Sequence, residues 1–213
     1  DTSISNAAVA VIKAAPEKYT DQTVGQAGVL STASGKMADA VTFFSQAAKM
    51  NPYFRDYQYN LAAMMYEAKQ AADMVPVVHK LVDLDPSNPD NYQLFTYGFK
   101  GVSDATKDPA VKKAAIDSVM YYGKIAEDMT VRLAYTDFER QASRTLLMGT
   151  VENRAKDAKS YSIDFEFLGK DGAVLQKSTA TVANVAPGAT GNFKVDIPVG
   201  GVYGVRYAPL PLK

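Results

Sequence analysis

Apolar residues recur three and four positions apart through the first part of the chain. The segment 38–50 carries a narrow stripe of small and aromatic side chains on one side: Ala40, Val41, Phe44, Ala47 and Ala48. The segments 54–68 and 74–84 repeat this spacing. Such spacing is typical of amphipathic α-helices, and alanines on the shared face let neighbouring helices approach closely. The pattern therefore predicts short antiparallel helix pairs.

From about residue 129 the pattern changes to an alternation of apolar and polar positions. Residues 160–167 show it best, with four apolar side chains on one face: Tyr161, Ile163, Phe165 and Phe167. Turn signals recur every ten to fifteen residues or so: Lys170-Asp171-Gly172, Pro187-Gly188 and Gly200-Gly201. Alternation with this punctuation is typical of a small antiparallel sandwich of about six or seven strands.

The two patterns together predict an α+β protein with two domains. We expect an α-helical repeat array over residues 1–128 and an immunoglobulin-like antiparallel β-sandwich over residues 129–213. The length of 213 residues is sufficient for two domains of this size.

A repeated proline sets the period of the helical part. Asn51-Pro52 and Asp85-Pro86 both follow an apolar helical stretch. The interval between the two prolines, about 34 residues, is the period of stacked helix–turn–helix units. We expect units at about 21–54, 55–88 and 89–127. The third has a longer predicted loop over 101–110 and a second helix that leaves the register, as a terminal capping unit does.

Charge and composition limit the classes of binding partner that we expect. Lysine plus arginine equals aspartate plus glutamate at 23 each, so no net field favours nucleic acid. No apolar run approaches the roughly 18 to 20 residues that cross a bilayer. The chain begins at Asp1 rather than methionine, which leaves a removed signal peptide or lipid anchor open. The expected partner is another protein or a peptide, and homo-oligomerisation stays open.

Few residues are of the types that form catalytic or metal-binding sites. Cysteine is absent, which excludes thiol nucleophiles and thiolate metal sites. His79 is the single histidine, and we expect it at the helix surface or between repeats rather than as a catalytic base. The glycine-rich stretch 200–204 links strands, so a phosphate cradle is not expected there. We therefore expect no enzyme activity, no catalytic residues, no metal and no cofactor.

Specific residues in the helical part resemble the tetratricopeptide repeat. Tyr59-Asn60-Leu61-Ala62 matches the family's Tyr-Asn-Leu-Gly, and Leu84-Asp85-Pro86-Ser87-Asn88 matches its Leu-Asp-Pro-Asn-Asn. In that family the first helix of each repeat lines a concave groove. The resemblance implies a peptide-binding groove with five candidate residues: Tyr59, Asn60, Tyr66, Tyr97 and Lys100.

The residues at the groove positions indicate which kind of ligand to expect. The family's basic clamp for peptide carboxylates needs positive residues at positions that here hold Gly25, Val29, Asp90 and Leu94, so that device is disfavoured. Tyrosine suits a peptide groove because it offers wide contact area at little entropy cost. The alternative, in which the tyrosine rings pack between helices, stays open.

The strand part resembles the FxLYD family, a small β-sandwich of bacterial envelope and secreted proteins. The matching segments are 149–153 (Gly-Thr-Val-Glu-Asn), 165–169 (Phe-Glu-Phe-Leu-Gly), Asp171-Gly172 and 185–193. In the naming motif Phe167, Leu168 and Gly169 replace Leu, Tyr and Asp. The resemblance implies attachment or recognition, in the bacterial periplasm, on the outer surface or in secreted form.

These observations favour a non-enzymatic scaffold that binds a protein or peptide through the helical groove. Two alternatives remain: a structural or oligomerisation component of a cell-envelope complex, and a carbohydrate-binding module that uses the β-sandwich.

Overall fold

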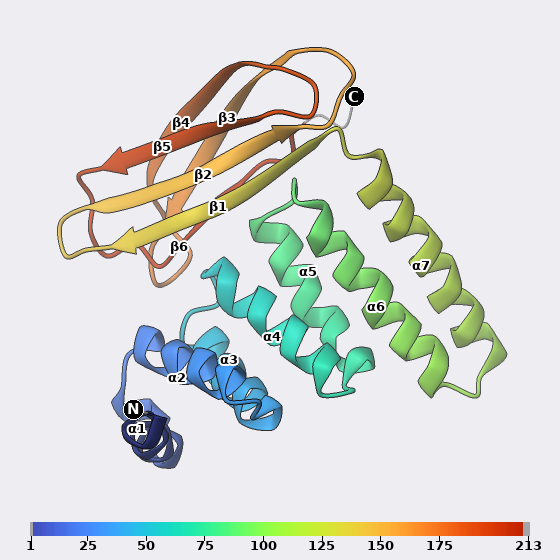
Figure 1. Ribbon diagram of the computed structural model, residues 1–213, viewed down its shortest axis with the longest axis vertical. Helices are drawn as coiled ribbons and strands as arrows, with labels where there is room; N and C mark the ends of the chain where they lie inside the picture. The colour runs from blue at the N-terminus through green and yellow to red at the C-terminus, as the bar shows by residue number, and fades with distance from the viewer. Residues whose placement is uncertain (1, 211–213) are drawn as a thin grey trace. The chain divides into compact units, whose positions relative to one another are not determined.

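The computed structural model describes residues 2–210, with side chains from residue 7 onward. Over this range seven α-helices are followed by six antiparallel strands (Figure 1). The helices are α1 (Thr2–Ala14), α2 (Asp21–Ala33), α3 (Met37–Met50), α4 (Arg55–Glu67), α5 (Val75–Leu84), α6 (Pro89–Ala105) and α7 (Pro109–Asp128), with short 3₁₀ turns η1 (Pro16–Lys18) and η2 (Ala71–Met74). The strands are β1 (Val131–Arg140), β2 (Thr145–Asn153), β3 (Lys159–Leu168), β4 (Val174–Val185), β5 (Thr190–Ile197) and β6 (Gly204–Tyr207).

By packing, the chain divides into two compact units. The first comprises Asp1–Lys80 and Leu94–Val119, and the second comprises Leu81–Gln93 and Met120–Lys213. The second unit therefore includes the end of α5, the start of α6 and the last part of α7 as well as all six strands. The predicted domain division at residues 128 and 129 stays a prediction.

The predicted period is present in the helix bounds. Helices α2, α4 and α6 begin at Asp21, Arg55 and Pro89, so the same interval separates successive starts. The second helices α3 and α5 end at Met50 and Leu84, which are separated by that interval again. Its length, about 34 residues, is that of a tetratricopeptide unit. Helices α2, α4 and α6 are therefore the first helices of three successive repeats.

The predicted long loop over 101–110 is wrong. Helix α6 continues to Ala105, and α7 begins at Pro109. The Asp108 Oδ1 accepts hydrogen bonds from the backbone N–H of Ala110 at 2.8 Å and of Val111 at 3.4 Å. A capping aspartate followed by proline is a strong helix start, so a short connection is enough.

The core of the first unit is made mainly from α2, α3 and α4. Phe43 is fully buried there, and Phe44 and Tyr57 pack in the same cluster. The small residues predicted on the shared faces, Ala40 and Ala47, are fully buried. Close approach through alanine is the physical reason for this packing.

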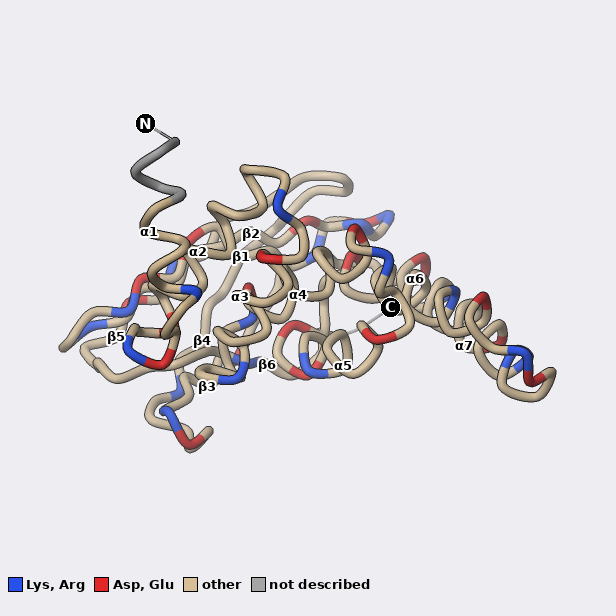
Figure 2. The backbone as a smooth tube through the Cα atoms, turned by 90° about the horizontal axis from the view of Figure 1, so that it is seen from below, with Lys and Arg blue, Asp and Glu red and all other residues tan. Residues whose placement is uncertain are grey.

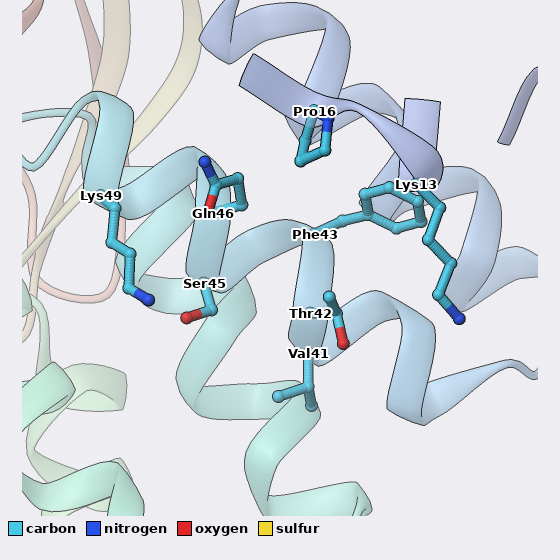
Figure 3. Close-up of a pocket in the computed structure, with 8 residues that line it drawn as sticks. All are labelled: Lys13, Pro16, Val41, Thr42, Phe43, Ser45, Gln46 and Lys49. Atoms are coloured by element: carbon cyan, nitrogen blue, oxygen red, sulfur yellow. The ribbon is translucent and has the colours of Figure 1, made fainter. Parts of the chain in front are cut away.

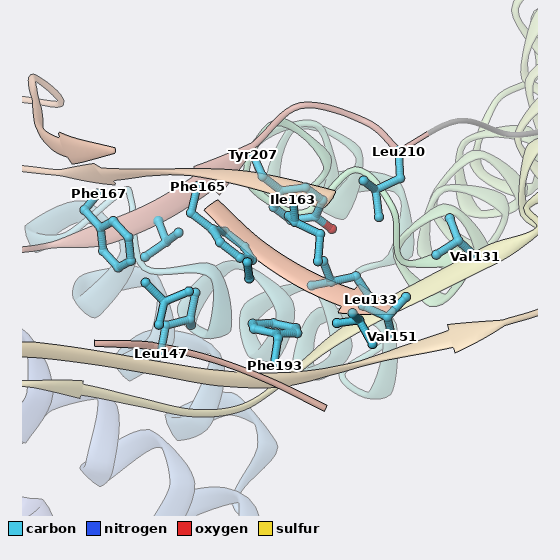
Figure 4. Close-up of a cluster of buried hydrophobic side chains, with 14 of the residues drawn as sticks. Val131, Leu133, Leu147, Val151, Ile163, Phe165, Phe167, Phe193, Tyr207 and Leu210 are labelled. Atoms are coloured by element: carbon cyan, nitrogen blue, oxygen red, sulfur yellow. The ribbon is translucent and has the colours of Figure 1, made fainter. Parts of the chain in front are cut away.

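The strands of the second unit form two three-stranded sheets, in the orders β1-β2-β5 and β4-β3-β6. Leu147, Val151 and Phe193 of one sheet share a buried cluster with Ile163 and Phe165 of the other (Figure 4). The two sheets therefore form a sandwich. The predicted alternation in β3 is confirmed, because its buried positions alternate with exposed or partly exposed polar ones.

Asn153 links two distant segments of the sandwich. Its side-chain Nδ2 donates to the carbonyl oxygens of Asp157 and Val185, both at 2.8 Å, and its Oδ1 accepts from the Tyr161 hydroxyl at 2.9 Å. The Gly188 N–H donates to the Asn153 carbonyl at 2.7 Å. The motif segments 149–153 and 185–193 therefore meet at one buried amide.

The turn between α5 and α6 belongs to the second unit and is buried there. The Tyr207 hydroxyl donates to Asp85 Oδ1 at 2.5 Å and accepts from the Ser87 N–H at 3.1 Å. The Leu133 N–H donates to the Ser87 carbonyl at 2.9 Å, and the Leu210 N–H donates to Ser87 Oγ at 2.8 Å. The proline-marked turn is thus hydrogen-bonded to β1, to β6 and to the segment after β6.

Candidate peptide-binding groove

The five candidate residues lie on α4 and α6, which are the first helices of two successive repeats. Tyr59, Asn60 and Tyr66 are on α4, and Tyr97 and Lys100 are on the part of α6 that belongs to the first unit. Tyr66 and Tyr97 each keep 41% of their surface exposed, whereas Tyr59 and Asn60 are partly buried.

Tyr66 and Tyr97 are brought together across α4 and α6. Their ring centroids are 4.8 Å apart with an interplanar angle of 26°, a stacked arrangement that aromatic pairs favour. Because both rings also remain solvent-exposed, the pair offers an apolar surface that carries two hydroxyl groups. This exposure distinguishes them from Tyr57, which is buried in the core.

Lys100 lies about one helical turn beyond Tyr97 on α6. Its Nζ is 2.7 Å from Asp104 Oδ2. This hydrogen bond, and secondarily the charge of Asp104, raises the pKa of Lys100. The ammonium group is therefore charged at neutral pH but already paired, which weakens it as a binder of ligand carboxylates.

Tyr59 is partly covered by its own helix. The guanidinium carbon of Arg55 lies 4.6 Å from the centre of the Tyr59 ring, within range of a cation–π contact. Arg55 Nη1 is also 3.0 Å from Asp56 Oδ1. A ligand that stacks on this face of Tyr59 has to displace the arginine.

Asn60 lies at the edge of a hollow of about 330 Å³ between α2 and α4. The lining residues are Gln22, Gly25, Gln26, Val29, Phe44, Phe54, Asp56, Tyr57 and Asn60. Gly25 is essential to its floor, since a Cβ at this position would lie 2.5 Å from the Tyr57 ring. The hollow thus has a buried aromatic floor and a polar rim.

Sequence reasoning missed Gln22 and Gln26 as groove residues. The signal that finds them is the repeat period, because Gln22 and Asp56 are one period apart, as are Gln26 and Asn60. Equivalent positions of two successive units therefore line the same hollow.

Two further hollows are bounded by residues whose charges are mostly paired. One of about 320 Å³ lies along α3 beside Lys13 and Pro16 (Figure 3), and Lys13 pairs with Asp39 at 2.6 Å. Another of about 310 Å³ lies on the β4-β3-β6 sheet. There Glu166 pairs with Lys177 at 2.7 Å and Arg206 at 2.8 Å, and these hydrogen bonds lower the pKa of the Glu166 carboxyl.

His79 lies apart from other side chains that bind metals. It is exposed, and its ring packs edge-on against Phe95, with centroids 4.6 Å apart. Among the described side chains, no group of three or more His, Cys, Asp or Glu is placed to hold a metal ion. Within residues 2–210, none of the helices combines the length and the apolar character that crossing a bilayer requires. Basic and acidic residues are interspersed along helices and strands (Figure 2).

Comparison with protein-family models finds no match for this sequence, and comparison with curated proteins finds none either. Among solved structures, it is similar to a thermophilic TPR protein from Thermus thermophilus, with 22% identity, a TM-score of 0.44, and coverage of 51% of this chain and 56% of that one. This chain thus spans little more than half the length of that structure.

Two other solved structures show weaker likeness. IrmA from Escherichia coli is 12% identical with a TM-score of 0.32, covering 37% of this chain and 72% of that one. The alkylpurine DNA glycosylase AlkC from Pseudomonas fluorescens, bound to DNA with an abasic site analog, is 9% identical with a TM-score of 0.25, covering 84% and 67%. None of these three likenesses reaches a TM-score of 0.5, so none carries a conclusion about function.

Proposed function

We propose that this chain is a non-enzymatic binding protein that holds an extended segment of another protein in the groove of a tetratricopeptide-like array. The observation that supports the proposal is that the hollow and the exposed tyrosine pair both lie on the first helices of successive repeats. The hollow lies between α2 and α4, and the exposed tyrosine pair joins α4 and α6. Helices that begin one period apart repeat the same exposed face, which is how repeat arrays build extended binding surfaces.

The strand part serves as an immunoglobulin-like attachment domain of the FxLYD type in this proposal. Its sheet orders β1-β2-β5 and β4-β3-β6 support a small antiparallel sandwich of this kind. The meeting of segments 149–153 and 185–193 at Asn153 gives the two motif segments a common structural role. We place the protein in the bacterial envelope or outside the cell on the strength of that resemblance.

The groove is tested with the triple variant Asn60→Ala, Tyr66→Ala and Tyr97→Ala in the full chain. A partner is recovered by affinity capture, identified, and titrated by calorimetry against both proteins. We expect the triple variant to weaken binding by at least about tenfold, since exposed aromatic anchors often contribute more than about 1 kcal/mol each.

The matched control is Tyr121→Ala, which removes a tyrosine that is 63% exposed on α7 and does not line the groove. This control should bind the partner as the wild type does. Unchanged binding by a folded triple variant would overturn the groove assignment.

Self-association is a second candidate, favoured by apolar exposure on α7. Ile116 is 45% exposed and Met120, one turn further, is 69% exposed. Large exposed apolar side chains close together favour protein contacts. Light scattering over a range of concentrations checks this candidate, and a monomer at every concentration rejects it.

A further inference from the structure

The hollow between α2 and α4 has an unequal distribution of charge. Of its lining residues, Asp56 alone is charged at neutral pH. Three amides share the rim with it: Gln22, Gln26 and Asn60. The remaining lining is aromatic, aliphatic or glycine. A ligand in this hollow therefore meets one carboxylate and several neutral donors and acceptors.

Asp56 keeps acceptor capacity towards a ligand. Its side chain is 50% exposed, whereas that of its partner Arg55 is only 16% exposed. A single Arg55 nitrogen, Nη1, donates to one Asp56 oxygen at 3.0 Å, and a carboxylate accepts about four hydrogen bonds. The Arg55 guanidinium also lies over the Tyr59 ring, so it interacts with that ring as well as with Asp56.

A second carboxylate lies behind the floor. Asp21 Oδ2 accepts hydrogen bonds from the Tyr57 hydroxyl at 3.2 Å and from Asn51 Nδ2 at 3.0 Å. Tyr57 is a floor residue of the hollow, so a second carboxylate is hydrogen-bonded to the floor from behind. Like charges brought close repel and opposite charges attract, which disfavours an acidic ligand and favours a basic one.

The size and surface of the hollow limit what enters it. About 330 Å³ is at the low end of the range for small-molecule pockets. The aromatic floor of Phe44 and Tyr57 favours an apolar side chain over a polar one. The amides of Gln26 and Asn60 can both donate to and accept from a peptide backbone, as extended-peptide recognition requires.

We infer that the occupant of this hollow is an extended partner segment that inserts one aliphatic side chain and carries a lysine or arginine close to it. This inference rests on the proposed function and names the chemistry of its ligand. The aliphatic side chain enters the hollow over Gly25, and the neighbouring cation pairs with the half-exposed carboxylate of Asp56.

The test is selection from a random heptapeptide display library on the immobilised full chain, wild type and Asp56→Lys in parallel. The wild type should enrich peptides with Leu, Ile, Val or Met next to Lys or Arg. Asp56→Lys should keep the aliphatic preference and exchange the basic neighbour for Asp or Glu. Enrichment of acidic neighbours by the wild type, or the same charge preference in both proteins, overturns the inference.

Titration of the best wild-type peptide measures the size of the effect. Asp56→Asn should weaken binding about threefold, as expected for a partly exposed charge pair. Glu17→Gln removes the same charge from an exposed residue outside the hollow and should leave the affinity unchanged. Equal affinity of Asp56→Asn and the wild type contradicts the pairing.

A blocking variant separates this inference from the proposed function. Gln26→Trp places a large ring at the rim and should abolish binding if peptides occupy the hollow. Loss of binding in Gln26→Trp without a charge preference leaves the groove standing and rejects the ligand class. If neither Gln26→Trp nor the triple variant weakens a selected peptide, both the groove and its ligand class are rejected. Circular dichroism confirms that each variant is folded.

Discussion

At the scale of single residues, the buried Asp85 shows how much one hydroxyl can matter. Asp85 is 1% exposed, and a buried charge is costly unless it is hydrogen-bonded. Asn91 Nδ2 donates to its Oδ2 at 2.9 Å, and the Tyr207 hydroxyl donates to Oδ1 at 2.5 Å. Tyr207 is itself 4% exposed, so water has little access to replace this bond.

Tyr207→Phe is therefore expected to lower the free energy of unfolding by about 1–3 kcal/mol, because it removes one donor to the buried Asp85 and the acceptor of the Ser87 N–H. Chemical denaturation followed by circular dichroism measures the change. Tyr121→Phe, at an exposed position, is the control and should stay within about 0.5 kcal/mol of the wild type. An unchanged midpoint for Tyr207→Phe contradicts the role given to the hydroxyl.

Alkaline pH should destabilise the second unit through the same tyrosine. Burial, and then the charge of Asp85, raises the pKa of Tyr207 well above the ordinary value of 10.0. The unfolded tyrosine ionises from about pH 10, whereas the folded one holds its proton to higher pH. Its contribution to stability is thus complete below about pH 10 and declines above it, by up to about 1.4 kcal/mol per pH unit.

Unfolding free energies measured between about pH 8 and pH 11 check this dependence. Burial also raises the pKa of Tyr92, Tyr122 and Tyr161, so part of the decline belongs to them. Tyr207→Phe should show a shallower decline above about pH 10 than the wild type. Parallel curves for the two proteins would show that Tyr207 does not contribute.

At the scale of elements, local periodicity was the most reliable guide. The spacing of small residues predicted helices whose observed starts repeat at a constant interval, and alternation predicted the buried face of β3. Both patterns record which face of an element is buried, and that is a local property. The loop predicted at 101–110 failed because Gly101 continues in α6, where a local glycine signal is overridden by packing.

Gly149 in β2 shows a packing demand that periodicity does not reveal. A Cβ there would lie 2.3 Å from Cζ of Phe193 and 2.5 Å from the Ala134 carbonyl oxygen. Gly149→Ala is expected to destabilise the protein by about 1–3 kcal/mol through overpacking. Thermal unfolding measures the loss.

Gly169→Ala is the matched control, because its Cβ would meet side-chain atoms no closer than 3.3 Å. It should cost clearly less than Gly149→Ala. Equal costs for the two variants would show that the close approach at Phe193 is relieved without strain.

At the scale of the whole molecule, each of the two compact units is built from two separate stretches of the chain. The segment Leu81–Gln93 joins the strands, and its Asp85 and Ser87 are hydrogen-bonded to Leu133, Tyr207 and Leu210. A fragment cut at the helix-to-strand transition would lose every one of these bonds.

The fragment 129–213 is therefore expected to unfold at a lower denaturant concentration than the strands do in the full chain. Hydrogen exchange at strand amides, measured in both proteins at increasing denaturant concentrations, determines this difference. Equal protection of the strands in fragment and full chain would show that residues 81–93 do not stabilise the sandwich.

The sequence by itself determined the local order of this protein: helices in a regular repeat, then strands with one buried face, with Asn60, Tyr66 and Tyr97 on the first helices of their units. Only the tertiary structure decided which residues meet. It stacked Tyr66 on Tyr97, gathered Gln26, Asn60 and Asp56 around one hollow, and buried Asp85 beside Tyr207. The reason is that periodicity records how an element is buried, whereas the identity of its neighbour depends on packing between segments far apart in the chain.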